Sequence, residues 1–132
     1  MDFANGKLYA IDNGTGRFWI YDVARDGTLT LESTKRVRLQ KDANDPNAEG
    51  PDTEGITVDG NGMVYVASER DNSAKGINDD RILMVDPSTE GEDLVALQEW
   101  NLTDSLPDVS ANMGIEAVEW VSAQDVNGKL VD

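Results

Sequence analysis

The sequence contains neither cysteine nor histidine among its 132 residues. The absence of cysteine excludes disulfides and thiol chemistry, and the absence of histidine excludes a Ser-His-Asp triad. The usual nitrogen and sulfur ligands of zinc are missing for the same reason. Any metal bound by this chain must therefore accept oxygen ligands, which is the preference of calcium and magnesium.

Basic residues are few, because 11 Lys and Arg stand against 26 Asp and Glu and give a formal net charge of −15. A surface of this sign repels phosphate backbones, which argues against a nucleic-acid partner. The same surface attracts cations. Solubility, or adaptation to a salty medium, is the simpler explanation of the charge.

Long apolar runs are also absent, so the sequence predicts no membrane span. The first residues, "MDFANGKLYAID", show neither a basic region nor an apolar run, and hence no secretory signal is visible. Hydrophobic residues make up 39% and charged residues 28% of the chain. This is the composition of a folded globular domain rather than of a disordered tail.

Short runs rich in Tyr, Val, Leu and Ile predict an all-β fold. The runs "GKLYAID" and "GMVYVAS" each begin at an Asn-Gly pair, the strongest short hairpin signal because both residues accept positive φ. We expect "RFWIYDV" and "RILMVDP" to be further strands, and "TLTLES" and "DLVALQEW" to be outer strands. Helical periodicity is too short for a helix anywhere, although "NLTDSLPDVS" has room for one turn.

An internal repeat indicates the architecture. The stretch "NGKLYAIDN" from Asn5 aligns with "NGMVYVASE" from Asn61, and "RFWIYDV" aligns with "RILMVDP". A third copy begins where "EAVEW" at Glu116 matches "EGITV" at Glu54. The unit is about 55 to 65 residues with four short strands, and repeats of this kind are typical of β-propeller blades.

The phase of the repeat divides the chain into three parts. We expect residues 1–45 to form most of one blade without its inner strand, residues 52–104 a complete blade, and residues 112–132 the start of a third. About two blades cannot close a ring, because propellers need about four to eight. Either the sequence is part of a longer propeller, or copies assemble into a homo-oligomer, for which a trimer would supply about six blades.

Three motifs follow one another between Asp52 and Trp120. An acidic residue precedes Glu-Gly-Ile in "DTEGITV", Ser-Glu-Arg occurs in "ASERD", and Asn-x-Gly-x-Glu occurs in "NMGIEAVEWV". In this order they resemble the esterase-like phytase family and the related SdiA-regulated family of six-bladed β-propellers. The resemblance implies a partial ring of a six-bladed propeller, and an esterase or phosphatase that depends on a metal.

Four oxygen-bearing side chains are predicted to meet at one rim of the propeller. Glu54 and Glu116 begin successive inner strands, whereas Glu69 and Asn13 are equivalent positions at the ends of second strands. In an up-and-down hairpin these two ends lie on the same side. We therefore predict a calcium site with Glu54 and Glu116 as ligands, joined by Glu69 and Asn13. The alternative is structural: Glu54 caps turn amides, and Arg70 forms an ion pair between blades.

Arg70 and Arg81 are the predicted ligand-binding residues, because an arginine at the channel rim can clamp a phosphate or carboxylate of a small molecule. A structural role for Arg81 is the alternative, since Arg17 is its equivalent in the repeat.

Three functions stay open. The family resemblance implies a calcium-dependent esterase or phosphoesterase, in which the metal polarises the ester and lowers the pKa of a bound water. The second function is a non-catalytic ligand-binding module, extracellular or periplasmic. The third is a structural propeller fragment that assembles into a ring. Because a fold does not fix a function, we favour binding over catalysis.

Overall fold

The computed structural model describes residues 1–106, 115 and 117–121. Within these residues the chain forms nine strands and three short 3-10 helices, and no α-helix. None of the helices in this part of the chain has the length and apolar character needed to cross a membrane. The predicted all-β fold is confirmed, as two separate sheets rather than a closed barrel.

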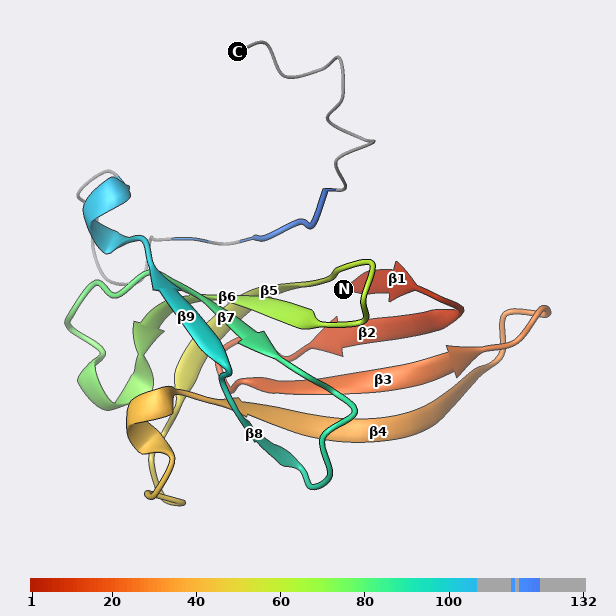
Figure 1. Ribbon diagram of the computed structural model, residues 1–132, viewed down its shortest axis with the longest axis horizontal. Coiled ribbons are helices and arrows are strands. Elements are labelled where there is room, and N and C mark those ends of the chain that lie inside the picture. Colours follow the sequence, from red (N-terminus) through yellow and green to blue (C-terminus); the bar gives the residue numbers. More distant parts are fainter. Residues whose placement is uncertain (107–114, 116, 122–132) are drawn as a thin grey trace, which may run out of the picture.

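The first sheet has five strands in the order β1-β2-β3-β4-β8 (Figure 1). Four of them follow one another as antiparallel hairpins: β1 (Asp2–Ala4), β2 (Lys7–Ile11), β3 (Arg17–Val23) and β4 (Leu29–Arg38). The fifth strand, β8 (Asp93–Val95), pairs with β4 in parallel. Both residues of the Asn5-Gly6 turn have positive φ (54° and 76°), as the Asn-Gly signal predicts.

The second sheet has four antiparallel strands in the order β5-β6-β7-β9. It is formed by β5 (Pro51–Val58), β6 (Val64–Asp71), β7 (Arg81–Val85) and β9 (Gln98–Asn101). The 3-10 helices lie in the connections: η1 (Gln40–Asp42), η2 (Asn72–Ala74) and η3 (Thr103–Ser105). The last of them is the single turn predicted within "NLTDSLPDVS".

The segment 93–101 differs from the prediction of one outer strand. Its first part, β8, belongs to the first sheet, and its second part, β9, belongs to the second sheet (Figure 1). The Ala96 N–H donates to the Arg38 carbonyl at 2.9 Å, and the Leu97 N–H donates to the Met84 carbonyl at 2.8 Å. The chain therefore changes sheets between two consecutive residues, a pairing that the apolar pattern of the segment does not specify.

The hydrophobic core lies between the two sheets. Thirteen buried residues form one cluster: Tyr9, Phe18, Ile20, Val37, Leu39, Ile56, Val58, Val64, Val66, Leu83, Val85, Leu94 and Ala96. They come from both sheets and from the segment that crosses between them. Full burial of one such aliphatic or aromatic side chain contributes about 1.5–3 kcal/mol, so this cluster holds the sheets face to face.

Residues 117–121 lie against β5 without forming a regular strand. Gly55 permits this approach, because a Cβ atom on it would lie 2.9 Å from the Cα atom of Ala117. The Trp120 N–H donates to Oγ1 of Thr57 at 2.8 Å. The Val58 N–H likewise donates to Oδ2 of Asp2 in β1, at 2.9 Å. The segment 117–121 is therefore linked to β5 in the same way as β5 is linked to β1.

Candidate metal centre and the neighbouring cleft

Three acidic side chains meet where β5 begins and β6 ends. Asp52 and Glu54 come from β5 and Glu69 comes from β6, and one carboxylate oxygen from each lies within 4.8 Å of the others. The β5–β6 ladder is irregular here, with register shifts on both sides of Thr53. Because such irregularities re-aim side chains, the local backbone brings these three residues together. We call them the acidic triad.

The acidic triad is largely shielded from solvent. Asp52 is 5% exposed and Glu69 is 1% exposed, whereas Glu54 is half-buried. Carboxylates held this close in a region of low dielectric repel one another unless a cation or a proton intervenes. Arg70 compensates part of the charge, because its Nε donates to Oδ2 of Asp52 at 2.7 Å. The close approach of the three carboxylates is the feature that makes this a candidate metal site.

Asp80, in the connection that leads into β7, is another buried carboxylate. Beyond the last β6–β7 pair, Ser68 with Arg81, the register changes: the Asp79 N–H donates to the Glu69 carbonyl at 3.2 Å, and the Asp80 N–H donates to Oγ1 of Thr103 at 2.9 Å. Asp80 has no exposed surface, and its Oδ1 accepts a hydrogen bond from the Ile115 N–H at 2.9 Å. Its Oδ2 has no hydrogen-bond partner among the described residues. Buried oxygens of this kind are usually satisfied by a protein donor, a water or an ion.

Two of the four predicted metal ligands, Glu54 and Glu69, lie in the acidic triad. Glu116 lies outside the described residues, and Asn13 is exposed in the turn that follows β2. The prediction did not include Asp52 as a ligand. Its signal is its position two residues before Glu54, but only the register shifts of β5 show that both side chains reach Glu69.

The two arginines predicted to bind a ligand are both paired with carboxylates. Arg70 binds Asp52, whereas Nε of Arg81 donates to both carboxylate oxygens of Asp79 (2.9 and 3.1 Å) and its Nη1 donates to Glu99 (3.0 Å). Burial would lower the pKa of Arg81, but Asp79 and Glu99 together raise it above its ordinary value. An anionic ligand would have to compete with these carboxylates, and the ligand-binding role stays a prediction.

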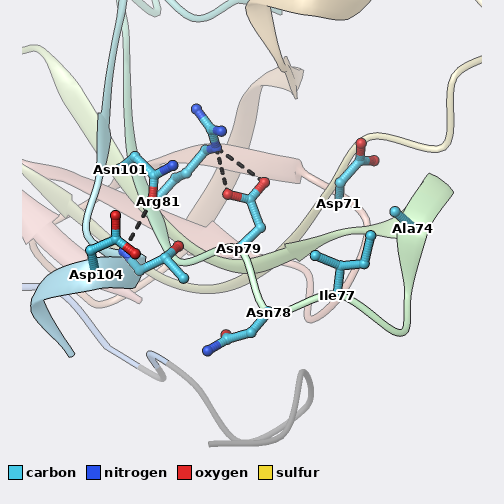
Figure 2. Close-up of a pocket in the computed structure, with 9 residues that line it drawn as sticks. Asp71, Ala74, Ile77, Asn78, Asp79, Arg81, Asn101 and Asp104 are labelled. Atoms are coloured by element: carbon cyan, nitrogen blue, oxygen red, sulfur yellow. Dashed lines mark hydrogen bonds and ion pairs between the residues drawn. The ribbon is translucent and has the colours of Figure 1, made fainter. Parts of the chain in front are cut away.

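Arg81 also lines an open cleft with a volume of about 330 Å³. Three carboxylates, those of Asp71, Asp79 and Asp104, and the amide of Asn101 contribute to its walls. Figure 2 shows Asp79 and Arg81 facing each other in this cleft, with Asp71 on another part of the wall. The cleft therefore carries charges of both signs beside the apolar side chains of Ala74 and Ile77.

Lys41 forms ion pairs with two buried carboxylates beside this cleft. Its Nζ lies 2.7 Å from Oδ2 of Asp71 and 3.1 Å from Oδ1 of Asp42, which are 7% and 6% exposed. Burial alone would raise the pKa of Asp71, but hydrogen bonds from Lys41 and from Ser73 outweigh burial and hold that pKa below its ordinary value. The carboxylates of Asp71 and Asp42 beside the cleft are thus held by Lys41.

Comparison with protein-family models matches residues 1–130 to the family described as phytase-like, esterase-like activity of phytase. Neither the curated proteins nor the solved structures contain a match to the chain. The matched region includes both sheets and all three residues of the acidic triad.

Proposed function

Because this chain belongs to the phytase-like family, described by the esterase-like activity of phytase, we propose that it is a β-propeller segment that binds calcium at the acidic triad. The bound ion would help to hold a small molecule that carries a phosphate or carboxylate group. In this proposal each sheet is a blade of a six-bladed propeller, and residues 117–121 begin the next blade. The observation that carries the proposal is the close approach of Asp52, Glu54 and Glu69.

The chemistry of the donors fits calcium. Calcium takes about six to eight oxygen ligands in flexible geometry, and three carboxylates leave coordination positions for water or for a ligand oxygen. Magnesium demands regular octahedral geometry and keeps several waters, which suits a shielded cluster less well. Zinc would lack its preferred nitrogen and sulfur ligands.

A bound calcium would supply a Lewis acid that polarises a phosphoryl or ester oxygen and lowers the pKa of a bound water. The residues of the chain position this site. Arg70 holds Asp52 through Nε, while its own Nη1 donates to the Lys75 carbonyl at 3.3 Å, so the guanidinium is fixed from two sides. With no imidazole or thiol in the sequence, proton transfer would fall to a carboxylate. We place ligand binding first and hydrolysis second, because the family fold alone does not establish a reaction.

Calcium binding is tested by calorimetry and by the melting temperature in a calcium titration. A ligand that binds only the folded state raises the free energy of unfolding by about 2.7 kcal/mol when its concentration is one hundred times its dissociation constant. We therefore expect the melting temperature to rise clearly as calcium is added. The double variant Glu54→Gln, Glu69→Gln should lose the shift. The matched double variant Glu49→Gln, Glu90→Gln removes the same charge at exposed positions and should keep it. Equal calcium binding by both double variants would place the site elsewhere.

Hydrolysis is tested on the same proteins with p-nitrophenyl esters and p-nitrophenyl phosphate. Any activity should disappear with a chelator and return with calcium, since the proposed reaction depends on the metal. Activity in excess chelator would contradict the metal mechanism. Calcium binding without hydrolysis would identify a ligand-binding module, and the absence of both would favour the structural fragment.

A further inference from the structure

Each sheet packs one face into the core and leaves an apolar face on the outside. On the first sheet, Phe3, Leu8, Tyr21 and Leu31 are successive partners across β1 to β4, and Trp19 shares their side of β3. Phe3 is 61% exposed and Leu31 is 53% exposed, whereas the other three are half-buried. We call these five residues the first outer face.

The second sheet has a corresponding surface. Tyr65 pairs with Met84 across β6 and β7, and Ile82 pairs with Trp100 across β7 and β9. The rings of Tyr65 and Trp100 are tilted toward each other, with their centroids 6.1 Å apart. Trp100 is 37% exposed and the other three side chains are half-buried. We call these four residues the second outer face.

The internal repeat relates the second outer face to a surface that is already buried in the core. In the repeat alignment its residues on β6 and β7 take the places of the residues that the first sheet buries. The equivalent pairs are Tyr65 with Tyr9, Ile82 with Phe18, and Met84 with Ile20. The second outer face is therefore built like the side of the first sheet that packs on the second sheet.

The reverse relation holds for the first outer face. Its residues on β2 and β3 take the places of residues that the second sheet buries: Leu8 with Val64, Trp19 with Leu83, and Tyr21 with Val85. The two outer faces thus correspond to the two sides of one contact that the chain already makes internally. Two different surfaces that complement each other give a head-to-tail contact rather than a two-fold one.

We propose that a second copy of this chain docks head to tail, with the first outer face of one copy against the second outer face of the other. The contact repeats the packing of the two sheets within a single chain. Residues 117–121 already lie beside β5, so the docked sheet is centred on β6, β7 and β9. The net charge of −15 opposes the approach of two copies, and salt screens this repulsion.

The test uses two variants that each block one face. Tyr21→Lys places a charge in the first outer face, and Met84→Lys places one in the second. Each variant alone should be a monomer of 14.4 kDa by light scattering at concentrations where the wild type associates. Mixed in equal amounts, the two variants should form a complex of two chains, because each retains one intact face and these faces are complementary.

Three controls make the outcome decisive. Ile77→Lys changes a residue that is 64% exposed in the β6–β7 connection and should associate like the wild type. Leu31→Lys and Trp100→Lys form a second pair at more exposed positions, in case the first pair fails to fold. All measurements are made with and without chelator, so that the effect of a variant on association can be distinguished from an effect on calcium binding. A wild type that stays monomeric, or blocked variants that do not complement each other, would overturn the proposal.

Discussion

Lys41 forms ion pairs with two buried carboxylates at the edge of the cleft, those of Asp42 and Asp71. Lys41→Met leaves Asp42 and Asp71 without their cation, and we expect a loss of about 1–3 kcal/mol in the free energy of unfolding at pH 7. Lys75→Met, at an exposed position in the β6–β7 connection, is the matched control and should change stability by less than about 0.5 kcal/mol. Urea denaturation of the three proteins measures both effects.

The difference between Lys41→Met and the wild type should depend on pH. The folded-state pKa of Asp71 lies below 3.8 in the wild type, so its stabilising contribution is present above that value and is lost as the pH falls through the folded pKa. Without Lys41, burial still raises this pKa while the hydrogen bond that lowers it most is lost, so the pKa of Asp71 should be higher than in the wild type and protonation should relieve part of the cost. The destabilisation should therefore shrink as the pH falls from 7 to 3. A difference that stayed constant over this range would show that Lys41 acts through packing rather than charge.

At the scale of residues, the sequence carries part of the candidate site. Glu54 and Glu69 could be predicted because the repeat and the hairpin topology put them at the same end of the β5–β6 hairpin. The place of Asp52 could not, because it depends on register shifts around Thr53 that no residue pattern encodes. The pairing of Arg81 with Glu99 could not be predicted either, because Glu99 lies on another strand, β9. Asp79, its other partner, is only two residues away in the sequence.

At the scale of elements, the crossing segment 93–101 joins the two sheets, and Leu94 is its buried anchor at 3% exposure. Leu94→Ala should cost about 2–5 kcal/mol, because it removes apolar contacts and leaves a cavity between the sheets. Val95→Ala, at a residue 37% exposed, should cost less than about 1 kcal/mol. Chemical denaturation compares the two. Similar losses at both positions would show that β8 is not packed against the core.

The strands that a sequence pattern predicts well are those whose neighbours are also adjacent in the chain. The runs "RFWIYDV" and "RILMVDP" form β3 and β7, each within a hairpin-connected sheet. The crossing segment was predicted wrongly as one strand, because its pairing with β4 joins residues far apart in the sequence. The alternation of apolar and polar residues shows which side chains of a strand face the core. It does not show which of the two sheets the strand pairs with.

At the scale of the whole molecule, head-to-tail association predicts a fixed number of chains in the assembly. If each chain supplies two blades and the ring has the six that the family resemblance implies, growth should stop at three chains of 14.4 kDa. Light scattering over a range of protein concentrations and salt should give a plateau at the trimer mass, reached at lower concentration as salt increases. A mass that keeps rising with concentration would show an open array instead of a closed ring.

Thr57 sits between Asp2 and Trp120 and uses its one hydroxyl group twice. The hydroxyl donates to Oδ2 of Asp2 at 3.2 Å and accepts from the Trp120 N–H at 2.8 Å. The hydrogen bond to Asp2 fixes the direction of the hydroxyl proton. With the proton fixed, a lone pair of the same oxygen points at the Trp120 N–H. One hydroxyl group thus couples β1 on one side of β5 to residues 117–121 on the other. Because such coupling is reciprocal, loosening either segment should weaken the hydrogen bond to the other, as between neighbouring units of a one-dimensional array.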